Sequence, residues 1–258
     1  MSEWCFLMYR SLILRTHGGL GNQLFQVFYA FCCCRTFEIG ELKIIHDSNY
    51  SHGFELAPIF KHHSGGVRLT ERLISKMRLP KILHRSKVLK IESIEIGSCL
   101  YLDGYFQDEK AYDIFSQDII ASSLRELIAD SGIDLSLSLS KDNLYHFRLG
   151  DFYANENLEY DAATRLVKSF HGYGDIITNN QTLLQKVLDS SEFRSETRNL
   201  IDTENFDAFA VLQLMINYKK VFSNNSTLAF WASVISGSEL VTTDDNLNAM
   251  RSKFIYDE

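Results

Sequence analysis

The sequence predicts an α/β protein with parallel sheets in two domains, and three observations support this. Short apolar segments typical of buried strands alternate along the chain with segments of helical periodicity. The 258 residues, 45% of them hydrophobic, can form a sizeable core in one large or two small domains. A polar, serine-rich stretch at 131–142 marks a boundary, so we expect domains at 1–138 and 139–258.

Charge and cysteine use exclude several classes of protein. The net charge of −7 argues against general nucleic-acid binding. Residues 61–90 depart from that average, because they hold nine Lys or Arg and one acidic residue, Glu71. No apolar run approaches the roughly 18–20 residues that span a bilayer. The cysteine run at 32–34 suits reduced thiols rather than a disulfide scaffold, so we expect a cytoplasmic protein.

The first motif joins a strand to a helix through a glycine-rich turn. Residues 11–15 predict a short buried strand, and 17–26 (HGGLGNQLFQ) follow almost directly. Gly19 and Gly21 let a ligand approach the backbone closely, and Asn22 places an amide beside a helix N-terminus, where free N–H groups favour an anion. Apolar residues then recur at helical spacing: Leu24, Val27, Phe28, Phe31 and Cys34.

Two interpretations of this turn remain open besides an anion site. A P-loop is set aside, because it ends in Gly-Lys-Ser/Thr and this turn ends in Gly-Asn-Gln. A dinucleotide fingerprint has Leu24 in place of its third glycine, but Glu38 and Glu41 lie near the sequence distance of a ribose-binding acid. A plain strand-to-helix turn without a ligand is the other interpretation.

The rest of the first half holds two strands and two helices. Strands are expected at 44–46 and 99–102, with a loop at 47–66 and a helix that ends near 129 with Phe115 on its buried side. Residues 69–78 have the pattern of a basic amphipathic helix. It is either a packed surface helix or, with the whole basic segment 61–90, a contact with an anionic membrane, where each basic residue contributes on the order of 1 kcal/mol.

In the second half, residues 143–153 (NLYHFRLGDFY) predict a strand that runs into a loop. Alternation places His146, Arg148 and Gly150 on one face. A lone arginine in a strand is often an edge or ion-pair residue. At the carboxyl end of a strand in an open α/β sheet, however, it lies where such folds bind ligands, and its guanidinium can hold two phosphate oxygens.

Two further strand-to-loop steps follow. Strands are expected at 175–178 and 220–223, with helices at 181–188, 206–218 and 228–235. Asn225, Ser226 and Thr227 precede the last helix and suit helix capping. The same hydroxyls and free N–H groups also suit a phosphate.

Four segments, in this order, resemble signatures of one enzyme family. The turn at 18–26 is similar to the opening motif of the family 11 glycosyltransferases, the α-1,2-fucosyltransferases and their bacterial relatives. Residues 104–110 (GYFQDEK) resemble another signature of that family. Residues 146–151 (HFRLGD) resemble the His-x-Arg-Arg-Gly-Asp motif of fucosyltransferases, and 225–232 (NSTLAFWA) the family's Asn-Ser-Ser-Phe-Ser-Trp-Trp-Ala. Each segment alone is weak, and their ordered occurrence over most of the chain favours the family.

The resemblance implies a GT-B arrangement, in which two Rossmann-like domains with parallel sheets face each other across a cleft. It implies transfer of L-fucose from GDP-fucose, or of colitose from GDP-colitose, with inversion to an α-1,2 product and without cofactor or metal. No Asp-x-Asp occurs, which argues against the metal-dependent GT-A arrangement. The expected acceptor is a lipid-linked oligosaccharide of a bacterial O-antigen or other surface polysaccharide, at the inner face of the cytoplasmic membrane.

The resemblance also assigns roles to single residues. Arg148 would bind the pyrophosphate and promote its departure, and Asn22 would lie near the acceptor oxygen or the leaving phosphate. The resemblance does not identify a general base, and the sequence leaves Asp151, His146 and His17 open as candidates. The other expected donor contacts are Gly19, Gly21, His146, Thr178, Asn179, Asn225, Ser226 and Thr227.

The chain departs from the family pattern at two places. Leu149 replaces the second arginine, and Thr-Asn-Asn stands at 178–180 where the family has Ser-Asp-Asp, whose carboxylate suits the guanine N–H groups. Two other functions therefore stay open: a nicotinamide oxidoreductase that uses residues 18–24, and a sugar-nucleotide-binding module without turnover.

Overall fold

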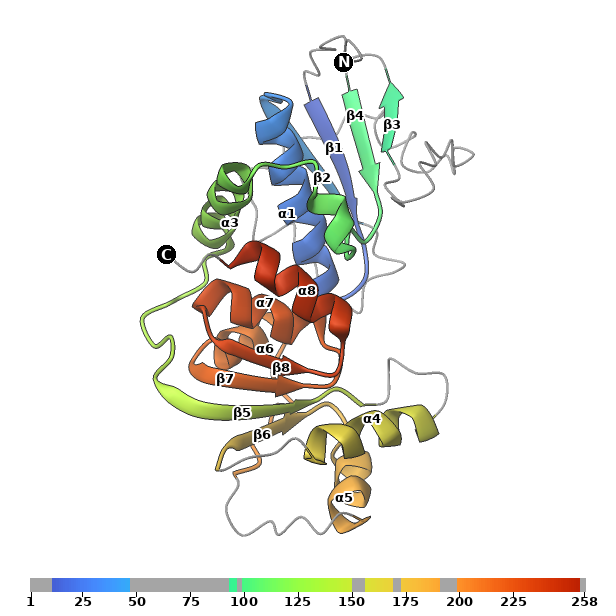
Figure 1. Ribbon diagram of the computed structural model, residues 1–258, viewed down its shortest axis with the longest axis vertical. Coiled ribbons are helices and arrows are strands. Elements are labelled where there is room, and N and C mark those ends of the chain that lie inside the picture. The colour runs from blue at the N-terminus through green and yellow to red at the C-terminus, as the bar shows by residue number, and fades with distance from the viewer. Residues whose placement is uncertain are drawn as a thin grey trace. The chain divides into compact units, whose positions relative to one another are not determined.

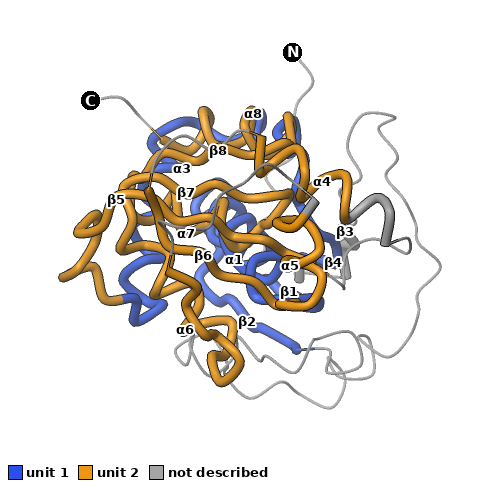
Figure 2. Tube along the Cα trace, turned by 90° about the horizontal axis from the view of Figure 1, so that it is seen from below, with its two compact units in different colours: residues 1–133 blue, residues 134–258 orange. Residues whose placement is uncertain are grey.

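The computed structural model describes residues 11–46, 93–96, 99–149, 156–168, 173–190 and 199–255. The chain divides into two compact units, residues 1–133 and 134–258, and each has its own sheet (Figure 2). The division falls inside the polar stretch at 131–142. The predicted α/β class with parallel strands is confirmed, because both units alternate strands and helices in a Rossmann-like manner.

Unit 1 contains a four-stranded sheet in the order β2-β1-β4-β3 (Figure 1). Three strands are parallel: β1 (Ser11–Thr16), β2 (Glu41–His46) and β4 (Cys99–Asp103). β3 (Ser93–Ile96) is an antiparallel edge strand. Helix α1 (Leu20–Thr36) follows β1, while the 3-10 helix η2 (Glu109–Tyr112) and helix α3 (Gln117–Ser131) follow β4.

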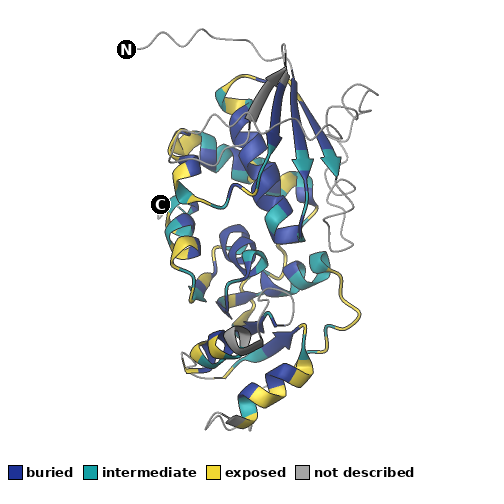
Figure 3. Cartoon of the chain, turned by 90° about the vertical axis from the view of Figure 1, so that its right-hand side faces the viewer, coloured by how far each residue is buried: buried dark blue, intermediate teal, exposed yellow. Residues whose placement is uncertain are grey.

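Helix α1 is apolar on almost every side and is buried along most of its length (Figure 3). Tyr29 on this helix stacks on Phe106, with ring centroids 4.3 Å apart. Tyr112 donates its hydroxyl to the carbonyl of Phe106 at 2.9 Å, and burial keeps the pKa of Tyr112 well above its usual 10.0, so the donor proton stays in place. These contacts hold the loop after β4 against α1.

Unit 2 contains a sheet in the order β6-β5-β7-β8 whose described strands are all parallel. The strands are β5 (Lys141–Phe147), β6 (Asp175–Thr178), β7 (Tyr218–Ser223) and β8 (Glu239–Thr242). Helices α4 (Glu156–Lys168) and α5 (Gln181–Ser190) lie on one face (Figure 1). Helices α6 (Ala208–Met215), α7 (Thr227–Ser236) and α8 (Asp245–Phe254) lie on the other.

The face of β5 that packs on α4 and α5 explains one departure from the family pattern. Tyr145, Phe147 and Leu149 alternate along this face and join one buried cluster with side chains of both helices. Leu149 is 1% exposed. Leu149 is therefore a core residue, and a charged arginine at this position would have to leave the cluster.

Several element boundaries differ from the sequence prediction. The helix expected to end near 129 begins only at Gln117, because Ser116 caps it after a turn. The helix expected at 206–218 is shorter, because Asp207 caps α6 and the chain enters β7 at Tyr218. Elements β3, α4, β8 and α8 were not predicted.

Some predictions concern residues outside the described ranges. These are the loop at 47–66, the amphipathic helix at 69–78 and the basic segment 61–90. Among the described helices, none combines the length and the apolar character that a membrane span requires.

Candidate functional site

Each sheet contains one point at which the chain changes its winding direction. In unit 2, β6 lies on one side of β5, and β7 and β8 lie on the other. In unit 1, β1 lies between β2 and β4 in the same way. Open α/β sheets bind ligands outside the carboxyl ends of the strands at such a switch point. The candidate residues follow β5, β6 and β7 in unit 2, and β1 and β4 in unit 1.

The main chain of Arg148 is held at the switch point of unit 2 by Asn224, which follows β7. The Asn224 Oδ1 accepts the Arg148 N–H at 2.8 Å, and the Asn224 Nδ2 donates to the Arg148 carbonyl at 2.9 Å. A flipped amide would lose both bonds, so the pair fixes its orientation. Asn224 is 2% exposed, which partly shields both bonds from water. We call this pair of bonds the Asn224 clamp.

A second asparagine holds the next residue. The Asn179 Oδ1 accepts the Leu149 N–H at 2.6 Å, so the loop after β6 also binds the loop after β5. Asn180 caps α5 by accepting the Leu183 N–H at 3.0 Å, and the Thr178 hydroxyl accepts the Asn180 N–H at 3.1 Å. The amide oxygen of Asn179 is thus used within the protein, and the expected contact of Asn179 with the guanine stays a prediction.

His146 connects β5 to β7, the two strands whose following residues the Asn224 clamp joins. Its Nδ1 lies 3.2 Å from the Ser223 hydroxyl on β7, and its side chain is nearly buried. This contact joins β5 to β7 at the level where the loops begin. Its roles as a base or as a donor contact stay predictions.

The start of α7 has the geometry of a capped helix N-terminus. Asn225 has a left-handed backbone with φ of 64°, which asparagine tolerates better than most residues. Ser226 is the N-cap and accepts the Ala229 N–H at 3.3 Å, so the predicted cap is confirmed. Thr227 begins the helix. The first-turn N–H groups of such a helix favour an anion.

The glycine turn of unit 1 brings together two of the four motif segments. Gly18 has φ of 81°, and a Cβ at this position would lie 2.9 Å from the Asn22 Nδ2. Gly19 is the N-cap residue of α1, and Gly21 lies in its first turn. The Asn22 Oδ1 accepts a bond from the Gln107 Nε2 at 2.8 Å, which joins the turn after β1 to the loop after β4.

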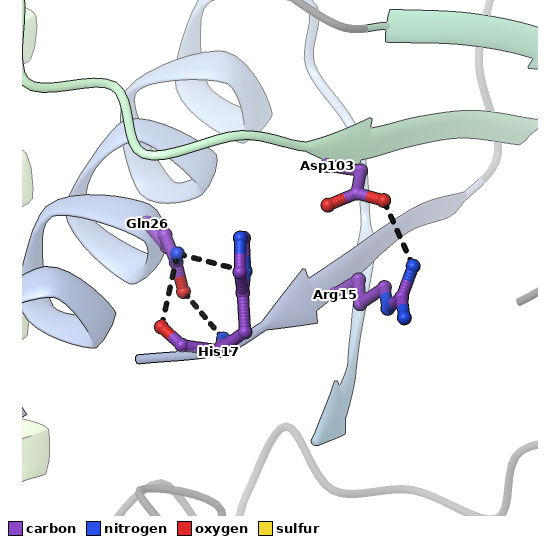
Figure 4. A network of polar contacts seen from close by, with 4 residues as sticks. All are labelled: Arg15, His17, Gln26 and Asp103. Carbon is purple, nitrogen blue, oxygen red and sulfur yellow. Dashed lines mark hydrogen bonds and ion pairs between the residues drawn. The ribbon is translucent and has the colours of Figure 1, made fainter. Parts of the chain in front are cut away.

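His17 is held at the end of β1 by Gln26, one helical turn beyond the glycines (Figure 4). Its ring also contacts the ring of Tyr105 in the loop after β4, with centroids 4.6 Å apart. Arg15 pairs with Asp103 at 3.1 Å, so β1 and β4 are joined at their carboxyl ends. The side chains that follow these two strands therefore form one polar cluster.

The structure places Glu41 away from the position that the dinucleotide interpretation of the turn requires. Glu41 begins β2 and pairs with Ser11, whereas His46 ends β2 and pairs with Thr16 beside the turn. Glu41 therefore lies about 16 Å along the strand from the carboxyl end, where a ribose-binding acid would stand. Glu38 precedes Glu41 and lies at the same wrong end.

The structure places the predicted residues in two groups, one at each switch point. Unit 1 holds His17, Gly19, Gly21 and Asn22. Unit 2 holds His146, Arg148, Thr178, Asn179, Asn225, Ser226 and Thr227. Asp151 lies outside the described residues. Within the described ranges, no three side chains of His, Cys, Asp or Glu form a group that could hold a metal ion.

Sequence reasoning missed three residues that organise the two groups. They are Asn224, Gln26 and Gln107, which bond to Arg148, His17 and Asn22. Each lies inside a motif segment or directly beside one. Spacing could not reveal the roles of Asn224 and Gln107, because a bond across more than 70 residues depends on how the strands pair. Gln26 lies only nine residues from His17, and its role depends on the path of the glycine turn between them.

No family model matches the chain, and no curated protein matches it. Among solved structures, an α-1,6-fucosyltransferase NodZ crystallised with GDP is similar at 13% identity and a TM-score of 0.47, over 88% of this chain and 92% of that chain. Fucosyltransferase NodZ from Bradyrhizobium is similar at the same identity, TM-score and coverage.

Proposed function

We propose that this protein is an inverting glycosyltransferase that uses a GDP-sugar. It moves L-fucose, or the related 3-deoxy sugar colitose, to a 2-hydroxyl of an acceptor glycan. Unit 2 binds the donor and unit 1 the acceptor, in a GT-B arrangement. The acceptor is a lipid-linked oligosaccharide of a bacterial surface polysaccharide, and the reaction takes place at the cytoplasmic side of the membrane.

One observation carries this proposal. Three loops at the carboxyl ends of adjacent parallel strands converge on the main chain at 148 and 149, through Asn224 after β7 and Asn179 after β6. The same loop after β7 leads directly into the capped start of α7. An arginine and a helix N-terminus thus follow neighbouring strands at a switch point, and both favour a diphosphate.

The chemistry needs a strong contact with the leaving group. The acceptor oxygen forms a bond to C1 of the sugar, the bond from C1 to the β-phosphate oxygen breaks, its electron pair leaves with GDP, and the hydroxyl releases its proton. The sugar passes through an oxocarbenium-like state, so stabilisation of the departing diphosphate should contribute most. Arg148 and the start of α7 supply this stabilisation.

Release of GDP tests the proposal. The full-length protein is mixed with GDP-fucose and, separately, with GDP-colitose, together with a panel of oligosaccharides that carry a free 2-hydroxyl. Arg148→Ala should lower the rate about a hundredfold or more, on the order of 3 kcal/mol, while Arg165→Ala on the exposed side of α4 should not change it. A wild-type protein that releases no GDP with either donor would overturn the proposal.

The two remaining alternatives predict different results. A nicotinamide enzyme would be stabilised against heat by NAD and not by GDP. A binding module without turnover would be stabilised by GDP but would release none from a GDP-sugar.

We also propose that the basic segment 61–90 contacts an anionic membrane surface. Its net charge is about +8, and the acceptor is expected to be lipid-linked. Sedimentation with liposomes tests this contact. Binding that does not increase with the fraction of anionic lipid would exclude it.

A further inference from the structure

Gln26 makes three hydrogen bonds to one residue, His17. Its Oε1 accepts the backbone N–H of His17 at 3.0 Å. Its Nε2 lies 3.1 Å from the His17 Nδ1 and 3.3 Å from the His17 carbonyl oxygen. Gln26 is fully buried on α1 (Figure 4) and His17 is partly buried, so these bonds are partly shielded from water.

The two backbone contacts determine which end of the Gln26 amide faces the imidazole. A backbone N–H can only donate and a carbonyl oxygen can only accept, so the Oε1 must face the first and the Nε2 the second. A flipped amide would place two donors together and two acceptors together. The orientation therefore follows from the bonds themselves.

This orientation determines the tautomer of His17. The Nε2 of Gln26 has two hydrogens, one for the His17 carbonyl and one directed at the His17 Nδ1. The Nδ1 must then accept, because a proton on it would meet an amide hydrogen. A neutral imidazole with an unprotonated Nδ1 carries its proton on Nε2.

We propose that His17 acts in the transfer reaction as a hydrogen-bond donor through its Nε2–H and does not take the proton of the acceptor hydroxyl. This inference rests on the proposed glycosyltransferase function and deepens it. The Nε2–H suits an oxygen of the substrate, either a sugar hydroxyl or a phosphate oxygen. The His17 ring contacts the ring of Tyr105. Arg15, two residues earlier, forms an ion pair with Asp103, so the charges of these two side chains balance each other.

The tautomer can be observed without any substrate. The full-length protein is labelled with 15N-histidine, and long-range proton–nitrogen correlation spectra identify which ring nitrogen bears the proton. The chain has eight histidines, so the His17 signals are assigned by their loss in His17→Gln. We expect the Nε2–H form near neutral pH. A ring protonated at Nδ1, alone or in addition to Nε2, would overturn the inference.

Kinetic measurements distinguish a hydrogen-bond donor from a general base at position 17. Glutamine can place an amide N–H near the position of the histidine Nε2–H but cannot act as a base, whereas leucine offers neither. We expect His17→Gln to keep turnover within about threefold and a pH profile parallel to the wild type, and His17→Leu to lose about tenfold or more. Loss of turnover in His17→Gln together with loss of the acidic limb of the profile would show that His17 is a base.

The substrate oxygen that His17 contacts follows from the same variants. In His17→Leu, a raised KM for the acceptor indicates a sugar hydroxyl, and a raised KM for the GDP-sugar indicates a phosphate oxygen. A leucine variant with wild-type kcat and both KM values would overturn the substrate contact. Failure of the proposed function is distinct, because the wild type would then release no GDP while the Nε2–H tautomer could still be observed.

Discussion

Replacement of Asn224 by alanine tests whether the geometry at Arg148 depends on the loop after β7. The variant removes both bonds of the Asn224 clamp, which measure 2.8 and 2.9 Å and end on the backbone of Arg148. The side chain of Arg148 is left chemically unchanged. Asn224 itself is almost fully buried, so water cannot easily replace the lost amide. The main-chain N–H and carbonyl of Arg148 are then left without these partners.

The cost follows from those two groups. A buried polar group that loses its partner costs about 1–3 kcal/mol, and the bonds are partly shielded, so we expect the free energy of unfolding to fall by about 2–3 kcal/mol. For a unit of this size, that corresponds to a melting temperature lower by about 10 °C. Turnover should fall further than stability explains, by about 10–100-fold, because misplacement of a catalytic group by about 1 Å has this effect.

GDP release and affinity for GDP are measured for both proteins at a temperature well below the transition of the variant. Thermal unfolding gives the loss of stability separately. Asn248→Ala is the matched control, because within the described part of the chain the exposed Asn248 amide makes a single long bond, 3.4 Å to the Thr242 carbonyl in the same unit. That variant should stay within about 0.5 kcal/mol of the wild type. An Asn224→Ala protein that loses stability but keeps full kcat and GDP affinity would refute the argument that the clamp positions Arg148.

Three further changes follow from local geometry. Gly174→Ala should lower the free energy of unfolding by about 2 kcal/mol or more, since a Cβ there would lie 2.6 Å from a ring carbon of Tyr145, whereas Gly40→Ala has open space and should be neutral; thermal unfolding compares them. Gly18→Ala should reduce turnover tenfold or more, measured by GDP release, because φ of 81° strains a residue with a side chain. Burial raises the pKa of Cys32 from its usual 9.0 to about 12. Mass spectrometry should therefore find this thiol unmodified by iodoacetamide at pH 8.5 until the protein is unfolded. The contribution of the buried thiol to the free energy of unfolding should be lost as pH rises from about 9 towards 12.

Much of the fold could be predicted from periodicity, because the buried strands β1, β4, β5 and β7 are short apolar runs followed by turn residues. The helical spacing of apolar residues also predicted α1, and the cap residues at 225–227 indicated where α7 begins. The prediction from periodicity failed for elements in which few residues are apolar. Helix α8 carries many polar residues and shows only Leu247, Met250 and Phe254 to the core. Strand β8 is a four-residue edge strand with few buried side chains.

The candidate site was predictable in its motif residues and not in its supporting bonds. Arg148, Asn22 and Ser226 follow from their place after a strand or before a helix. Asn224 binds main-chain atoms of a residue that the sheet brings near, so its role appears only when the strand order is known. Gln26 binds His17 across the glycine turn, so its role appears only when the path of that turn is known. The position of Leu149 in the core likewise depends on the register of β5 against two helices.

The Asn224 clamp and the bond from Asn179 both end on backbone atoms. These three bonds therefore hold the backbone at 148 and 149 whichever side chain stands at 148. An engineer could exchange that side chain for lysine, glutamine or histidine and read the chemical consequence alone, with the scaffold unchanged. In this protein, the chemistry at 148 and the architecture that carries it are separable variables.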